Sequence, residues 1–152
     1  MPNRGIPRLK GFDYSAERTY FVTFCAKNRQ PVFAELQNCV AAKETLLRYR
    51  ALGWYWLNCY CVMPDHIHLL IRTRNRSHSL SAIVARLKRQ IREASCGEPP
   101  EWHWQLGFHD RVLREHENVR GYAQYILANP IRRGMAKEVG DYPFCAVVDP
   151  WF

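Results

Sequence analysis

Long hydrophobic runs are absent from this 152-residue chain, and no stretch approaches the roughly 20 apolar residues that a membrane span requires. No apolar segment follows the charged N-terminus, so we expect no signal peptide, no membrane partner and a cytoplasmic location. Internal repeats, low-complexity linkers and glycine-rich nucleotide-binding loops are also absent. Because 47% of the residues are hydrophobic, disorder is excluded, and we predict one domain over residues 19–152 behind a polar arm, residues 1–18.

A disulfide or zinc framework is missing too, although the chain contains six cysteines. No pair has the C-x-x-C spacing, and Cys59 and Cys61 are too scattered from the others for a zinc site. Thiols without such a framework are usually small apolar core residues that stay reduced. We therefore interpret the cysteines as core residues.

Acidic residues are scarce, since 14 Asp and Glu stand against 22 Lys and Arg and leave a net charge of +8. Excess positive charge attracts polyanions by Coulomb steering and counterion release. The chain also has five Trp and eight Tyr, on which unpaired bases could stack. Charge and aromatics favour a nucleic-acid partner, but they would equally fit a basic protein with no such function.

The sequence does contain a clear succession of strand and helix patterns. These predict strands at 20–25, 54–63, 66–71 and 107–114, and helices at 35–52, 79–94 and 118–128. The last helix is expected to stop at Asn129, because the residue before a proline avoids the helical conformation. This order is typical of a ferredoxin-like split βαβ fold, an α+β protein whose antiparallel sheet has helices on one face and, here, an added C-terminal helix.

Apolar periodicity predicts which side of each helix faces the core. For helix 79–94 the inward residues are Ile83, Val84, Leu87 and Ile91, with Ser77 or Ser79 as the N-cap. For helix 35–52 they are Leu36, Val40, Leu47 and Ala51.

The first candidate functional residues are two histidines on a predicted strand. Side chains alternate along a strand, so His66 and His68 point from one face and Ile67 from the other. Two neutral imidazoles so placed can chelate one divalent metal ion. The H-x-H pattern alone is as typical of structural histidines as of a metal site, and a third ligand is needed.

Tyr125 and Asn129 form a second pair, four residues apart on one face of the last predicted helix. A helix laid over the sheet could bring both to the histidines, with the Asn129 oxygen as a metal ligand. A tyrosine hydroxyl is a poor nucleophile at neutral pH, but it can attack a phosphodiester that a metal ion polarises. Taken singly, each of the two also fits a purely structural role. Tyr122 lies on a similar helical face, but the four-residue spacing to Asn129 favours Tyr125 as the nucleophile.

At these residues the sequence resembles the single-tyrosine HUH transposases (His, hydrophobic residue, His), and in particular their REP-associated branch. The resemblance spans about residues 10–145 in the family's order. The stretches that carry it include YFVTF at 20–24, NRQPVF at 28–33, VMPDHIHLLI at 62–71, GFHDRVLR at 107–114 and YILANP at 125–130, followed by RRG at 132–134.

The resemblance implies that His66, His68 and Asn129 bind a divalent ion, Mg²⁺ or Mn²⁺, and that Tyr125 is the catalytic nucleophile. It implies a ferredoxin-like fold and activity on single-stranded DNA, at hairpins formed by repetitive extragenic palindromes. Cleavage would leave a 5′-phosphotyrosine and a free 3′-hydroxyl. With one tyrosine per chain, complete transposition needs two protomers, as in a homodimer, or two successive rounds.

Candidate DNA contacts are cations, which could pair with phosphates, and the residues of the His-Asp-Arg stretch at 109–111. They are Arg86, Lys88, Arg89, Arg92, His109, Arg111, Arg132 and Arg133. Two other functions remain open at this point. One is a non-catalytic nucleic-acid-binding module on the same fold, and the other is a metal-dependent nuclease that activates water without a tyrosine.

Overall fold

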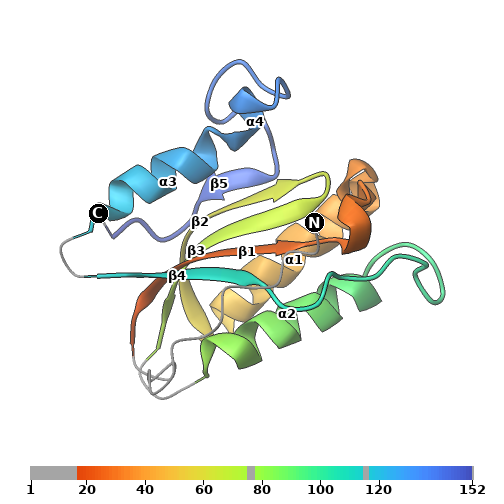
Figure 1. The fold of residues 1–152 in the computed structure, drawn as a ribbon, viewed down its shortest axis with the longest axis horizontal. Helices are drawn as coiled ribbons and strands as arrows, with labels where there is room; N and C mark the ends of the chain where they lie inside the picture. Colours follow the sequence, from red (N-terminus) through yellow and green to blue (C-terminus); the bar gives the residue numbers. More distant parts are fainter. Residues whose placement is uncertain (1–16, 75–77, 115–116, 152) are drawn as a thin grey trace.

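The computed structural model describes residues 17–74, 78–114 and 117–151 and contains one five-stranded antiparallel sheet in the order β4-β1-β3-β2-β5 (Figure 1). The strands are β1 (Thr19–Cys25), β2 (Tyr55–Met63), β3 (His66–Thr73), β4 (His109–Leu113) and β5 (Cys145–Val147). The helices are α1 (Leu36–Ala51), α2 (Leu80–Glu93), α3 (Val119–Leu127) and α4 (Asn129–Arg132), with short 3-10 turns η1 (Lys27–Arg29) and η2 (Val32–Ala34). Of the expected arm, residues 1–16 lie outside the described residues.

The order of the first four strands confirms the ferredoxin-like prediction. β3 lies between β1 and β2 and is antiparallel to both, and β4 lies on the outer side of β1. Each βαβ half therefore crosses over one face of the sheet, which is where a right-handed connection puts its helix. The three-residue β5, which extends the sheet beyond β2, was not predicted from the sequence.

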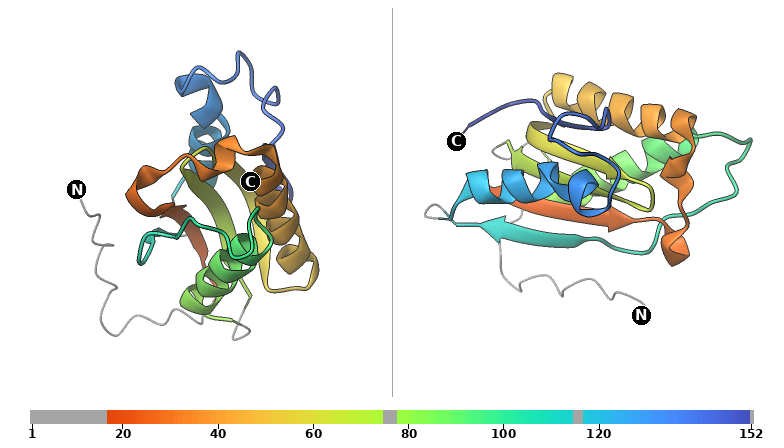
Figure 2. Two further views of the ribbon diagram at one scale, coloured as in Figure 1. Left: turned by 90° about the vertical axis from the view of Figure 1, so that its right-hand side faces the viewer. Right: turned by 90° about the horizontal axis from the view of Figure 1, so that it is seen from above.

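Helices cover both faces of the sheet (Figure 2). On one face lie α1 and α2, over the larger core cluster, to which alternate β3 residues such as Ile67, Leu69 and Ile71 contribute. On the other face α3 packs over a smaller cluster that includes Leu70, Ala123 and Ile126. The histidines and the tyrosine singled out by the sequence belong to this second face.

The predicted inward face of α2 is correct. All four expected residues are buried, and the Ser79 hydroxyl accepts a hydrogen bond from the backbone N–H of Ala82 at 3.2 Å. Of the two candidate N-caps, Ser79 is therefore the one that caps the helix. Ser77 lies outside the described residues.

The predicted inward face of α1 is mostly wrong, since only Leu47 of its four residues packs partly buried against the larger core. Leu36 and Val40 are exposed, and the helix instead buries small and polar residues together with Leu46 and Tyr49. One reason is local. The Asn38 side chain donates to the Val32 carbonyl oxygen at 2.9 Å and accepts from the Cys96 backbone N–H at 2.9 Å, so this side of α1 is fixed against the neighbouring turns. Buried polar groups with satisfied hydrogen bonds can override a weak apolar periodicity.

The chain does not leave the helical conformation at Asn129 as expected. α3 ends at Leu127, but Ala128 is helical (φ −85°, ψ −4°) and Asn129 begins the four-residue α4. Pro130 is tolerated because it stands in the first turn of α4, where its missing N–H would have no intrahelical partner. Asn129 therefore stays close to the helical path of Tyr125.

The prediction that the cysteines are core residues is largely confirmed. Five of the six cysteines are buried, as expected for core thiols, and Cys96 is partly exposed. The β2–β3 hairpin turns over Pro64 and Asp65, and neither residue has a positive φ, so the turn is not type I′. None of the described helices is long and apolar enough to cross a membrane.

Candidate active site

The two histidines point to the face of the sheet that α3 covers. Their neighbour Ile67 belongs to the cluster under α1 and α2, so the alternation predicted for this strand is correct. His66 is 2% exposed and His68 is 8% exposed. β3 is thus buried on both faces, with apolar residues on one side and imidazoles on the other.

The imidazole rings converge through their Nε2 atoms, which are 3.1 Å apart. Two nitrogens about 2.1 Å from one metal ion, at a right angle, would be about 3.0 Å apart. When both lone pairs point at the same place they repel each other unless a cation lies between them. The spacing therefore fits two ligands of one ion.

Each ring is held from behind through its Nδ1 atom. Asp65 Oδ1 lies 2.7 Å from Nδ1 of His66, and Thr23 Oγ1 lies 2.7 Å from Nδ1 of His68. Arg29 in turn contacts Asp65 at 3.4 Å. An Nδ1–H that donates to such a partner leaves Nε2 with the free lone pair a metal ion requires.

The charge state of the imidazoles also suits a metal ligand. Burial, helped by the positive charges of His66 and Arg132, lowers the pKa of His68 to about 3. Burial also lowers the pKa of His66, although the hydrogen bond that its Nδ1–H donates to Asp65 opposes this by raising the pKa. Both rings are therefore neutral near pH 7.

Tyr125 and Asn129 reach the histidines within a single chain. All four residues line one pocket of about 290 Å³, together with Thr23, Arg29, Arg132 and Arg133. Asn129 is 5% exposed, whereas Tyr125 is 53% exposed and its ring centroid lies 6.3 Å from that of His68. The sequence-predicted candidates for metal binding and nucleophilic attack are thus brought together.

Within the residues that the structure describes, no group of three or more His, Cys, Asp or Glu side chains could hold a metal ion. Asn129, which lines the same pocket, remains the predicted third donor beside His66 and His68. A set of two imidazoles and one amide oxygen leaves room for water and phosphate oxygens, which Mg²⁺ and Mn²⁺ favour.

Three arginines surround the pocket. Arg132 and Arg133 were predicted as DNA contacts, but Arg29 was missed, as were the supporting residues Thr23 and Asp65. The Arg132 guanidinium lies 4.1 Å from the centroid of the Tyr125 ring and donates to the Tyr125 carbonyl oxygen at 2.8 Å. Asp65 could have been noticed because it directly precedes His66. Thr23 reaches the site because β1 pairs with β3, and Arg29 reaches it from the turn after β1, so neither could be found from the local sequence.

The four cations of α2 lie on the opposite face of the sheet. Lys88 donates to the carbonyl oxygens of Gln105 and Gly107, and Arg92 donates to those of Trp102 and Pro100. These two side chains therefore have a structural role. Whether they also contact DNA stays a prediction.

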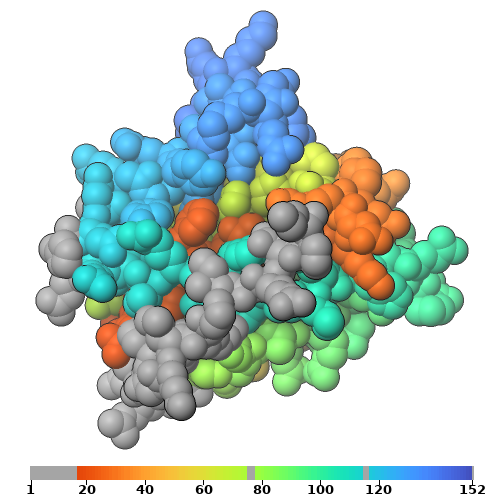
Figure 3. All heavy atoms as spheres, in the orientation of Figure 1, coloured from red at the N-terminus to blue at the C-terminus, as the bar shows by residue number. Residues whose placement is uncertain are grey.

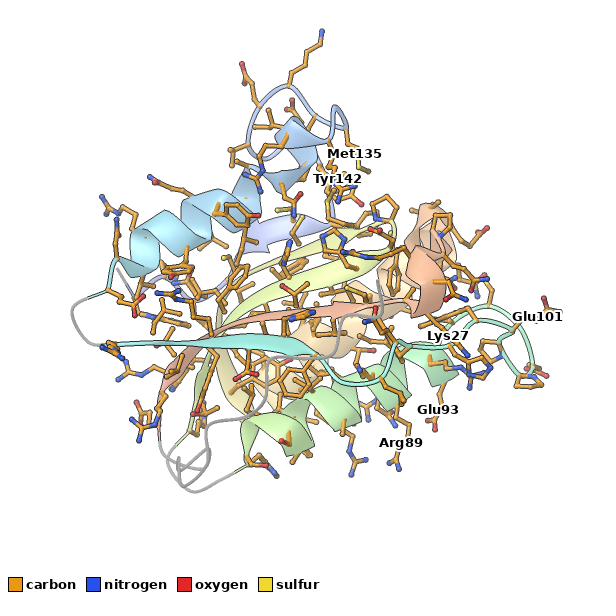
Figure 4. All side chains as sticks on the ribbon, in the orientation of Figure 1. Lys27, Arg89, Glu93, Glu101, Met135 and Tyr142 are labelled. Atoms are coloured by element: carbon orange, nitrogen blue, oxygen red, sulfur yellow. The ribbon has the colours of Figure 1, made fainter. Side chains whose placement is uncertain are left out.

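The other two α2 cations, Arg86 and Arg89, are also remote from the pocket. Arg86 lies over the Trp54 ring at 5.5 Å, and Arg89 pairs with Glu93 at 3.9 Å. Figure 4 shows Arg89 and Glu93 on α2, far from Met135 and Tyr142 near α4.

His109 and Arg111 lie on the histidine side of the sheet. Leu113, two residues further along β4, packs in the cluster under α3, and strand alternation puts His109 and Arg111 on the same face. His109 pairs with Thr23, which pairs in turn with His68, so the three form one row across the strands. Whether His109 and Arg111 contact DNA stays a prediction.

Comparison with known proteins assigns the chain to a class, the transposases, which are DNA-cleaving enzymes. More particularly, residues 15–105 match the family described as "Transposase IS200 like", and the chain belongs to that family. The matched range includes His66 and His68 but ends before Tyr125. The assignment of Tyr125 and Asn129 therefore rests on their geometry and on the motif resemblance.

Individual relatives agree with the family. The REP-associated tyrosine transposase of Escherichia coli (strain K12) is 25% identical over 126 residues, which cover 83% of this chain and 74% of that protein. A REP-associated tyrosine transposase solved in complex with a REP hairpin superposes with a TM-score of 0.74 at 22% identity, over 92% of this chain and 82% of the other. A candidate transposase of Deinococcus radiodurans gives a TM-score of 0.52 at 21% identity, over 82% and 97%. These structural matches support the fold.

Proposed function

We propose that the protein is a divalent-metal-dependent transposase that cuts and rejoins single-stranded DNA at palindromic hairpins through a covalent bond to Tyr125. The observation that carries the proposal is the shared pocket. It unites two convergent neutral imidazoles, an amide oxygen, an accessible tyrosine and three arginines in one chain. A non-catalytic binding module would have no need of this combination.

In the proposed reaction the Tyr125 hydroxyl oxygen attacks the scissile phosphorus. The new bond joins that oxygen to phosphorus, the bond from phosphorus to the 3′-oxygen breaks, and the tyrosine proton is lost to solvent. The departing 3′-oxygen gains a proton, which leaves a 5′-phosphotyrosine and a free 3′-hydroxyl. Because the phosphodiester is exchanged and not hydrolysed, attack by another 3′-hydroxyl can rejoin strands without ATP.

His66, His68 and Asn129 would hold the metal ion, which when bound withdraws charge from the phosphate oxygens. Asp65 and Thr23 keep the imidazoles in orientation through their Nδ1 atoms. Arg132 and Arg133 add positive charge beside the phosphate, and Arg132 also lies against the nucleophile's ring. The protein thus orients the tyrosine and neutralises the charge that develops during attack.

The substrate part of the proposal draws on the relatives. Two carry a REP-associated name, and one of these was solved with a REP hairpin bound. A hairpin with flanking single strand offers both a shape and unpaired bases, which suits a basic protein with exposed aromatics. We place the activity in the cytoplasm. A homodimer would allow two strand ends to be held at once, since each chain has its own tyrosine and histidines.

The test is to mix the protein with labelled single-stranded hairpin DNA and Mg²⁺ or Mn²⁺ and to separate the products on a denaturing gel. We expect a protein–DNA adduct and a shortened strand. Tyr125→Phe should abolish both, because it removes only the attacking oxygen.

Tyr49→Phe is the matched control, since it deletes one hydroxyl from α1 on the other face of the sheet and should leave the adduct unchanged. Cleavage by Tyr125→Phe at the wild-type rate would support a nuclease that activates water. Binding without any metal-dependent cleavage would support a non-catalytic module.

A further inference from the structure

A second hollow lies beside the candidate active site, between α3 and the strands β1 and β4. Its volume is about 440 Å³, and its described lining consists of Phe21, Arg111, Asn118, Gly121, Tyr122 and Tyr125. In Figure 3, atoms of β1 are visible between those of α3 and those of β4. Three of the lining residues are aromatic, and the cationic one, Arg111, has a side chain that is 61% exposed.

The hollow adjoins the catalytic pocket, because Tyr125 lines both. Phe21 contacts residues of both pockets. Its ring stacks on His68 at 5.4 Å between centroids and lies 6.0 Å from Tyr125 and 5.8 Å from Tyr122. An aromatic surface therefore runs from the histidines, where the scissile phosphate would lie, into the hollow.

Contacts within the chain already hold two walls of the hollow, Tyr122 and Arg111. The Tyr122 hydroxyl donates to Glu117 at 3.2 Å, and Arg111 pairs with the same carboxylate at 3.2 Å. The Arg111 guanidinium also lies 5.8 Å from the Tyr122 ring centroid. A binding surface that needs no rearrangement loses little entropy when it is filled.

Gly121 contributes to the open space. The Asn118 side chain accepts a hydrogen bond from the Gly121 N–H at 3.0 Å and caps α3, and a Cβ atom at Gly121 would lie only 3.1 Å from the Asn118 side-chain nitrogen. Glycine here allows the cap and the hollow to coexist, although it lowers helix propensity.

We propose that the hollow binds an unstacked nucleobase of the nucleotide next to the scissile phosphate. The inference rests on the proposed function and extends it to how the cut position is held. Aromatic faces bordered by a guanidinium are the surfaces on which unpaired bases stack. A base held here fixes its own phosphate between Tyr125 and the histidines, so the hollow positions the strand for attack.

The test uses hairpin DNAs in which the nucleotide on the 5′ or the 3′ side of the scissile phosphate is abasic. At one of the two positions, loss of the base should slow adduct formation by wild-type protein about 10-fold, the size expected for one stacked base. Tyr122→Leu, which keeps an apolar side chain but removes the ring, should slow cleavage of intact DNA by a similar factor. It should lose nothing further on the abasic DNA.

Tyr122→Phe keeps the ring and removes only the bond to Glu117, so it should remain sensitive to the abasic position. If neither abasic DNA reacts more slowly than intact DNA, the proposal is wrong. It is also wrong if the effects of Tyr122→Leu and of the abasic site multiply, because the ring and the base would then act independently.

Two further measurements distinguish a failure of this proposal from a failure of the proposed function and from misfolding of a variant. If wild-type protein forms no adduct with any DNA, the proposed function is wrong. The base-binding proposal is then tested by the affinity of Tyr125→Phe protein for intact and abasic DNA. We expect the same difference of about 10-fold between the two affinities. Arg111→Gln alters an exposed side chain and so leaves folding intact. It should reduce the difference between intact and abasic DNA, and an unchanged difference would count against the pocket.

Discussion

The two faces of the sheet carry different kinds of side chain. The face under α1 and α2 is closed by large apolar side chains such as Phe24, Leu69 and Leu87. The face under α3 has a smaller cluster, with Cys59 and Ile126 among its members, and opens into two adjoining pockets. One face therefore supplies most of the apolar burial, and the other supplies the reactive groups.

Strand β3 belongs to both faces at once. Successive residues alternate between the large core and the candidate metal site. The backbone that carries the imidazoles is therefore held in place by the packing of the large core on the other face of the sheet. A site built on such a strand is held more firmly than one on a loop. Stability and activity should therefore be separable by substitutions at neighbouring positions of β3.

The largest expected effect is on the α3 face. Replacing both His66 and His68 with alanine should lower the rate of DNA cleavage by at least about 1,000-fold, since several kcal/mol of charge stabilisation depend on the metal ion. Removing the metal with a chelator should have the same effect on wild-type protein. The rate of adduct formation measures both.

The same double variant should bind Mn²⁺ far more weakly in a calorimetric titration. Both side chains are buried, so its free energy of unfolding should fall, but by less than a cavity in the large core would cost, because the two side chains line a pocket. Unchanged Mn²⁺ affinity would contradict the assignment of the ligands.

The next effect in size is on the opposite face. Leu69→Ala should lower the free energy of unfolding by about 3 kcal/mol, because it leaves a cavity in the larger core. Urea denaturation measures the loss. The folded protein should cleave hairpin DNA at the wild-type rate, since Leu69 contacts the side of the sheet away from the pocket. A stable but inactive Leu69→Ala protein would show that the two faces cannot be separated.

Much of this division could be predicted from sequence. Strand alternation is a strong pattern, and it correctly put His66 and His68 on one side and Ile67 on the other. The inward face of α2 was equally clear, because four apolar residues recur with helical spacing. The face of α1 was not, since its buried side includes Asn38 and Thr45, whose hydrogen bonds compensate for their polarity only in the folded protein.

The candidate site was predicted in part for a similar reason. Tyr125 and Asn129 could be paired by their spacing, and the motif resemblance joined them to the histidines. Thr23 and Arg29 could not be found in this way, since they approach the site from distant parts of the chain. The α2 cations show the reverse problem, because charge alone does not indicate which face of the sheet a helix covers.

A smaller effect is expected at Thr23, which holds the His68 ring through its Nδ1 atom. Thr23→Val removes the hydrogen-bond partner of His68 Nδ1 and keeps the shape of the side chain. It should weaken Mn²⁺ binding about 10-fold, the usual size of such a supporting contact.

Thr45→Val is the matched control. It also removes one hydroxyl, which donates to the Ala41 carbonyl oxygen at 2.7 Å on α1, but it should leave Mn²⁺ affinity unchanged. Equal losses of affinity in the two variants would mean that the threonine next to the histidine has no special role.

The smallest effect concerns which face the DNA follows. Arg133 lines the catalytic pocket, whereas Arg89 lies on α2 and pairs with Glu93. If Arg133 contacts one phosphate of a single strand, Arg133→Gln should reduce the slope of log affinity against log salt concentration by about 0.7. Arg89→Gln should leave that slope unchanged. Fluorescence anisotropy over a salt series measures both slopes. Equal reductions would mean that the DNA contacts both faces of the sheet and not only the face with the candidate site.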